Sequence, residues 1–260
     1  MYNSIIKAAS EYSAFSFSIE LFEFIRPDRK SLTIAFEKMI NSDCSAYIIA
    51  PVMQEETLVL LLDNNIKVPY CFIDSPLPGA EPLCTVSQDP YKAGLLSGKL
   101  IELVSEKKER FIVLRPYSEA FNLNERVRGF IDWFKNKKDI QVQSIVGRDS
   151  SDESLSSAIE NIENLDEVDG ICTVNSSTHK IAQIIQEKGL RNKISIVGFD
   201  LVDKNKVYLV DNKIDCVISQ NPEEQGRRAI TQIFRKIILE EDVEKQIEMP
   251  FDIYFKENLL

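Results

Sequence analysis

Apolar and polar positions along the chain follow two different periods, and this pattern predicts a regular succession of strands and helices. Short apolar runs are typical of buried strands, and apolar residues spaced three or four apart are typical of helices. The clearest unit is the stretch 168–200. It contains an apolar run at 170–174, a helix face with Ile181 and Ile185, and a second apolar run at 194–199. Two parallel strands joined by a helix form a βαβ crossover.

The same alternation extends over the rest of the chain. Further strands are predicted at 15–24, 46–50, 70–73, 83–86, 111–114, 140–146, 215–219 and 251–255. Further helices are predicted at 2–9, 28–41, 54–65, 89–104, 124–136, 155–162, 204–210 and 222–238. This alternation predicts an α/β protein with parallel sheets, and the number of strands favours two sheets over one.

The first predicted element is a helix, and this is unusual for such a fold. A doubly wound sheet normally begins on a central strand. The helix at 2–9 therefore predicts that one strand of the first sheet, with whatever precedes it, is missing from this chain.

Polar groups stand where several predicted strands end. In an open parallel sheet, ligands bind beyond the carboxyl ends of the strands. The candidates are Asp74, Asn175, Asp200 and Gln220, each directly after a strand, and Arg126 near the start of the helix after strand 111–114. Two carboxylates, two amides and a guanidinium provide the acceptors and donors that a hydroxyl-rich small molecule requires. Tyr117 or Phe121 could cover an apolar face of this ligand.

A purely structural role is the alternative for each of these residues. Asp and Asn after a strand commonly cap the next helix, and an arginine near a helix start is commonly a surface group. The prediction of a binding site therefore depends on the five polar groups occurring together.

The overall charge and the cysteines exclude several other classes. With 41 acidic and 31 basic residues the net charge is −10, which argues against direct binding to nucleic acid or an anionic membrane. The five cysteines form no CxxC pair, so neither a disulfide framework nor a metal site is predicted. No apolar stretch is long enough to span a membrane, and the start of the chain lacks the features of an export signal. We therefore expect a cytoplasmic protein.

Catalytic motifs are absent from the sequence as well. There is no GxGxxG, no GxxxxGK[ST] and no GxSxG, so no nucleotide cofactor and no serine nucleophile are indicated. The single histidine, His179, has no obvious acid or nucleophile beside it. We expect a binding protein without a cofactor, although an enzyme on a doubly wound sheet stays the third alternative.

Several segments, in their order, resemble the ligand-binding core of LacI-family transcription regulators and ribose-type periplasmic sugar-binding proteins. These segments are VPYCFID, TVSQDPYKAGLLSGKLI, NERVRGF, ICTVN, IVGFD, ISQNPEEQGRRAI and a final FKEN. The resemblance implies two α/β lobes joined by three hinge crossings that close over a sugar-like effector. The implied lobes are 1–87 with 221–247 and 88–220 with 248–260. It also implies that Asp74, Arg126, Asn175, Asp200 and Gln220 contact the effector.

The function implied first is the effector-sensing part of a LacI-type regulator, a homodimer that reaches DNA only through an upstream headpiece. The alternative is a solute-binding protein of a sugar transporter. The chain departs from the family pattern at Ser75 and Ser176, where a longer polar residue and an acidic residue are usual. The opening strand and the helix-turn-helix headpiece of such regulators are also absent from this sequence.

Overall fold

The computed structural model describes residues 2–12, 15, 17–26, 28–117, 120–149 and 151–259. The chain forms two compact units, the first made of residues 1–88 and 221–250 and the second of residues 89–220 and 251–260. The chain thus passes between the units three times. The first unit ends at Gln88 and at Pro250, close to the expected bounds of 87 and 247, and Gln88 donates a hydrogen bond to the carbonyl of Pro250 at 2.6 Å.

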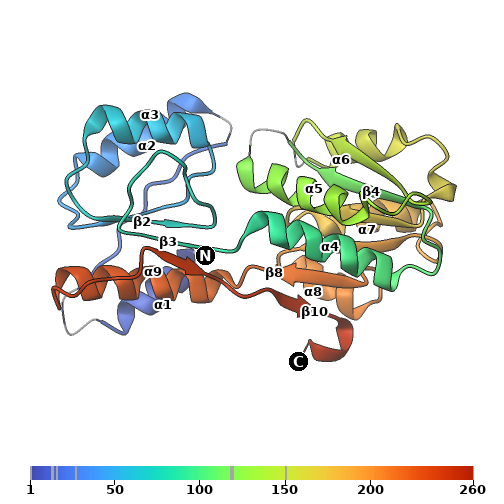
Figure 1. The fold of residues 1–260 in the computed structure, drawn as a ribbon. Helices are drawn as coiled ribbons and strands as arrows, with labels where there is room; N and C mark the ends of the chain where they lie inside the picture. The colour runs from blue at the N-terminus through green and yellow to red at the C-terminus, as the bar shows by residue number, and fades with distance from the viewer. Residues whose placement is uncertain are drawn as a thin grey trace. The chain divides into compact units, whose positions relative to one another are not determined.

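The first unit contains a parallel four-stranded sheet in the order β1-β2-β3-β9. The strands are β1 (Tyr47–Ile49), β2 (Tyr70–Ile73), β3 (Cys84–Ser87) and β9 (Gln246–Glu248). The helices are α1 (Tyr2–Ser10), α2 (Arg29–Ile40), α3 (Gln54–Asn64) and α9 (Pro222–Ile237). Helices α1 and α9 pack on one face of the sheet, and α2 and α3 cover the other (Figure 1). Strand β9, with Ile247 as its one apolar residue, was too short for periodicity to detect.

The strand predicted at 15–24 is wrong. Residues 15 and 17–24 form no strand, and Ser16 lies outside the described residues. Side chains of this segment nevertheless pack in both cores of the first unit: Phe17 and Ile19 pack with α1 and α9, and Phe22 packs with α2 and α3. A strand also requires a hydrogen-bonded neighbour, and within the described residues the backbone of 17–24 has none.

The second unit contains a six-stranded sheet in the order β10-β8-β7-β6-β4-β5. The strands are β4 (Arg110–Arg115), β5 (Gln141–Val146), β6 (Gly170–Thr173), β7 (Ser195–Phe199), β8 (Cys216–Ser219) and β10 (Asp252–Tyr254). All pairs are parallel except β10 with β8, where Ile253 faces Ile218. The predicted βαβ crossover is present, because β6 pairs directly with β7.

The helices of the second unit cover both faces of its sheet. They are α4 (Pro90–Val104), α5 (Phe121–Phe134), α6 (Asp152–Glu160), α7 (Thr178–Glu187) and α8 (Asp203–Val210), with single 3-10 turns at Leu165–Glu167 and Lys256–Asn258. Alternate residues of β4 face the two cores, Phe111 toward α4 and α5 and Ile112 toward α6 and α7. The α/β class with largely parallel sheets is confirmed. None of the described helices is long and apolar enough to cross a membrane.

Helices α4 and α5 are in unusually close contact. A Cβ atom on Gly94 of α4 would lie 2.1 Å from the carbonyl oxygen of Arg126, and one on Gly129 of α5 would lie 2.1 Å from that of Tyr91. The small residues of α4 therefore allow the two helices to pack closely. Helix α5 begins at Phe121, earlier than predicted, so Phe121 lies on a helix and not in a loop.

Candidate functional site

Each unit has an aspartate in the left-handed conformation directly after a strand. Asp74 follows β2 with φ 71° and Asp200 follows β7 with φ 66°. This conformation is uncommon for residues other than glycine, and Asp and Asn tolerate it best. The backbone N–H of Asp74 donates to Gln225 at 2.9 Å, and that of Asp200 donates to the carbonyl of Ile218 at 2.8 Å. Both carboxylates thus stand at the carboxyl ends of parallel strands, where the sequence predicts ligand groups.

Gln220 and Asp200 come together at the ends of neighbouring strands. The Gln220 side-chain amide follows β8 and donates to the Asp200 carboxylate at 2.8 Å. Gln220 is only 7% exposed, so this bond is shielded from water. The contact orients one carboxylate oxygen of Asp200 and leaves the carboxylate with capacity to accept further hydrogen bonds.

Arg126 is a buried cation at the same edge of the second unit. It is 2% exposed, its Nη1 donates to the carbonyl of Val174 at 2.8 Å, and its guanidinium lies 4.3 Å from the centroid of the Phe199 ring. Its Nε has no hydrogen-bond partner within the described part of the chain. A buried donor without a partner costs about 1–3 kcal/mol, so the arrangement favours a ligand that accepts from this guanidinium.

The side chain of Asn175 has a structural role, which was the alternative to ligand binding considered for it. Its Nδ2 donates to the Ser177 hydroxyl at 3.0 Å, and its Oδ1 accepts from the Ser177 N–H at 3.4 Å. These local bonds shape the turn into α7. Ser177 is the N-cap residue of α7, and its side chain makes no capping hydrogen bond. Asn175 still lies beside Val174, whose carbonyl accepts from Arg126, so it belongs to the same edge.

The structure therefore brings four of the predicted residues together in the second unit. They are Arg126, Asn175, Asp200 and Gln220, and we call them the carboxyl-edge cluster. Asp74 is the equivalent group of the first unit. Tyr117 packs partly buried against the core beneath α5, and Phe121 is half-buried in the first turn of that helix. Among the described residues, no group of three His, Cys, Asp or Glu side chains is placed to hold a metal ion.

Two buried side-chain amides that hold the strand ends at Asp200 and Asp74 were not predicted from the sequence. Asn205 of α8 is fully buried, and its Nδ2 donates to the carbonyls of Phe199 and Asp200 at 3.1 and 2.8 Å. Its Oδ1 accepts from the backbone N–H of His179 at 2.9 Å. Gln225 of α9, also fully buried, holds the backbone of Asp74. Both occur among charged residues, which predict an exposed helix face.

His179 contacts Asn205 with its ring as well, at 2.9 Å from Nδ1 to Oδ1. Burial lowers the pKa of His179, and the bond to Asn205 opposes this shift. The histidine therefore has a structural partner and is more than a simple surface residue.

We expect Asn205→Ala to lower the free energy of unfolding by about 2 kcal/mol, because several buried carbonyls then lack a donor. Urea denaturation of the variant and the parent chain measures this difference. Asn136→Ala, at an exposed turn, is the control and should change stability by less than about 0.5 kcal/mol. If the free energy of unfolding falls equally in the two variants, the hydrogen bonds of Asn205 do not stabilise the fold.

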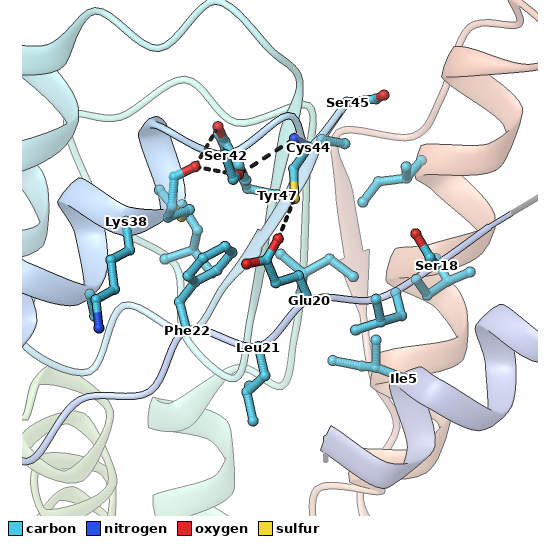
Figure 2. A pocket seen from close by; sticks show the side chains of 18 of the residues that line it. Ile5, Ser18, Glu20, Leu21, Phe22, Lys38, Ser42, Cys44, Ser45 and Tyr47 are labelled. Atoms are coloured by element: carbon cyan, nitrogen blue, oxygen red, sulfur yellow. Dashed lines mark hydrogen bonds between the residues drawn. The ribbon is translucent and has the colours of Figure 1, made fainter.

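A cavity of about 1250 Å³ lies in the first unit and has a different location from the predicted site (Figure 2). Its walls are residues of the segment 15–24, of α2, of the stretch 41–50 and of α9. None of the seven predicted ligand residues lines it.

The comparisons with known proteins agree on the fold. No curated protein sequence matches the chain. A candidate LacI transcriptional regulator from Bacteroides fragilis is 20% identical with a TM-score of 0.90, and the match covers 99% of this chain and 91% of that chain. GanP, a glucose-galactose binding protein from Geobacillus stearothermophilus, is 20% identical with a TM-score of 0.85 and coverages of 99% and 93%.

A carbohydrate transporter solute-binding protein from Agrobacterium radiobacter, solved with D-arabinose, is 19% identical with a TM-score of 0.86 and coverages of 99% and 90%. These likenesses establish a fold of the type I periplasmic-binding-protein kind. The model of the family described as periplasmic binding protein domain matches residues 1–241. The chain therefore belongs to the periplasmic binding protein domain family.

Proposed function

We propose that the chain binds a sugar or sugar-like small molecule through the carboxyl-edge cluster. The observation that carries the proposal is the pairing of Asp200 with Gln220 beside the buried Arg126, whose Nε lacks a partner among the described residues. A carboxylate and a guanidinium held in fixed positions can accept from and donate to neighbouring hydroxyls of one sugar ring. The solved relatives that bind glucose, galactose or D-arabinose support the choice of ligand class.

The proposed role is binding and not catalysis. Nothing at the carboxyl edge pairs a nucleophile with a base within the described residues: His179 is hydrogen-bonded to Asn205, and the nearby Cys172 is buried with a pKa raised to about 12 by that burial.

Thermal denaturation with a panel of mono- and disaccharides tests the proposal. A ligand at 100 times its Kd adds about 2.7 kcal/mol to the stability of the folded form. For a chain of this size, that corresponds to roughly 5–10 °C in Tm. We expect at least one sugar in the panel to produce such a shift. If no sugar, sugar acid or sugar phosphate raises Tm, the sugar-binding proposal is wrong.

We further propose that the chain is the effector-sensing part of a LacI-type regulator, acting as a cytoplasmic homodimer in which ligand binding alters DNA binding by an attached headpiece. The high structural similarity to the candidate regulator supports this role.

A solute-binding protein of a sugar transporter is the second candidate, favoured by the two sugar-binding relatives of nearly equal similarity. The sequence encoded upstream of Met1 separates the two roles. A helix-turn-helix there would support the regulator, and an apolar export segment would exclude it.

A further inference from the structure

A second arginine, which was not among the predicted ligand residues, stands at the carboxyl edge of the second unit. Arg115 is the last residue of β4, and its side chain lies on the same face of the sheet as Val113, toward α4 and α5. The carbonyl of the preceding Leu114 accepts from the Val174 N–H at 3.0 Å, and the Val174 carbonyl accepts from Arg126. Arg115 therefore ends its strand beside the residue that holds Arg126.

The Arg115 guanidinium is fixed at one nitrogen and has no protein partner at another. Its Nη1 donates to the side-chain oxygen of Asn124, near the start of α5. Its Nε is buried and, like that of Arg126, has no hydrogen-bond partner among the described residues. Buried donors are normally paired, so two such guanidinium nitrogens at one edge indicate a ligand that brings several acceptor oxygens.

Carboxylates do not neutralise these two arginines. Within the part of the chain that the structure describes, neither arginine forms an ion pair, and Glu125, between Asn124 and Arg126 on α5, is paired with Arg128 instead. Asp200 is the one acid of the carboxyl-edge cluster, and it already accepts from Gln220. Two guanidiniums beside one carboxylate leave this edge with an excess of positive charge, although the net charge of the chain is −10.

The amino-terminal end of α5 adds to this positive charge. The helix has 14 residues, its N-cap residue Ala120 makes no side-chain capping bond, and its first turn contains no acidic residue. The backbone N–H groups at a helix start carry a partial positive charge that stabilises a nearby anion. Because Arg115 is bonded to Asn124 near this start, the guanidinium and the helix end act at the same place.

We propose that the ligand is a sugar that carries an anionic group, a carboxylate or a phosphate, and that Arg115 binds this group. The inference rests on the proposed function, because it names the ligand class of the same site. The carboxyl-edge cluster binds the ring hydroxyls, and Arg115, with the start of α5, binds the anionic oxygens. A guanidinium suits this role because its planar fork donates to two oxygens of a carboxylate or phosphate at once.

Salt provides a first check of the charge that the ligand carries. Attraction between opposite charges is screened by dissolved ions, so the affinity for an anionic sugar should fall as NaCl rises from about 0.05 to about 0.5 M. The affinity for a neutral sugar should change much less over the same range. Calorimetry at several salt concentrations measures both dependences.

The main test compares each neutral sugar with its own anionic forms, by Tm and by calorimetry. The matched sets are glucose with glucuronate and glucose 6-phosphate, galactose with galacturonate, and D-arabinose with D-arabinose 5-phosphate. We expect an anionic member to bind at least about tenfold more tightly than its neutral partner, because hydrogen bonds to charged groups are the stronger ones. The set built on glucose distinguishes a carboxylate from a phosphate.

The variant Arg115→Gln removes the charge and should weaken the anionic ligand at least about tenfold more than the neutral sugar. Arg115→Lys keeps the charge without the planar fork, so it should lose only part of the preference, and it carries the test if Arg115→Gln does not fold. The matched control is Arg148→Gln, because Arg148 follows β5 at the same sheet edge and its side chain is 74% exposed. This control should keep the full preference for the anionic ligand.

The possible failures are distinguishable. If the neutral and anionic partners bind equally well, this inference is wrong and the proposed sugar binding still stands. If the preference for the anion survives in both Arg115→Gln and Arg115→Lys, or falls as much in Arg148→Gln, Arg115 does not bind the anionic group. If no sugar of either kind raises Tm, the proposed function is wrong and this inference fails with it.

Discussion

Replacing Asp200 by alanine is expected to abolish the rise in Tm that the bound sugar causes. Hydrogen bonds to a charged group contribute about 1.5–3 kcal/mol, so losing this carboxylate should weaken binding roughly 10- to 150-fold. We expect this large effect because the side-chain amide of Gln220 donates to the Asp200 carboxylate at 2.8 Å and orients it. The backbone N–H of Asp200 is also hydrogen-bonded at the end of β7. Calorimetry or thermal shift with the sugar found in the panel measures the effect.

The controls separate binding from backbone strain. Asp200 has φ 66°, and alanine in this conformation costs about 1–2 kcal/mol, so Asp200→Ala should also lower Tm without sugar. Asp200→Gly removes the carboxylate without that strain and should regain stability but not binding. Asp139→Ala, at an exposed position, should leave binding unchanged. If Asp200→Gly binds the sugar as tightly as the parent, Asp200 is not a ligand.

Gly94→Ala is expected to destabilise the protein by about 3 kcal/mol, at the upper end of the usual cost of overpacking. Helix propensity alone predicts the opposite, a gain of about 1 kcal/mol for this change. The steric effect should dominate because the added Cβ would lie 2.1 Å from the Arg126 carbonyl oxygen, which belongs to the backbone of α5 and cannot rotate away. Thermal or urea denaturation shows directly whether Gly94→Ala raises or lowers the stability of the protein.

Lys99→Ala is the control for this prediction, since Lys99 is exposed on the same helix and its change should stay within about 0.5 kcal/mol. Separating α4 from α5 would also displace Arg126, so Gly94→Ala should weaken sugar binding. A Gly94→Ala variant as stable as the parent would show that the two helices can move apart at little cost.

The local features of the binding edge could be predicted from sequence. Asp74, Asp200 and Gln220 each follow an apolar run that is a strand in the structure, and a residue after a parallel strand must lie at the carboxyl edge. Asn175 was found by the same reasoning, but its side chain is bonded within its own turn. Position along the chain does not tell whether an amide points to a ligand or to its neighbours.

Contacts between distant residues could not be predicted in the same way. Asn205 and Gln225 occur among charged residues, and only the folded chain shows that they are buried and hold the turns at Asp200 and Asp74. Burial of Arg126 beneath Phe199 likewise requires α5 to lie against the sheet. These contacts depend on how helices pack, which periodicity does not specify.

The sequence by itself determined the α/β class, the order of most elements and the strand-end positions of the candidate ligands, because these follow from apolar period and from local connectivity. Only the tertiary structure decided whether residues 17–24 form a strand, because a strand exists through hydrogen bonds to a neighbour and not through its own side chains. The alternation of Phe17, Ile19 and Phe22 directs their side chains into the two cores. A cavity lies beside residues 17–24, so the backbone groups of these residues have no neighbouring strand with which to pair.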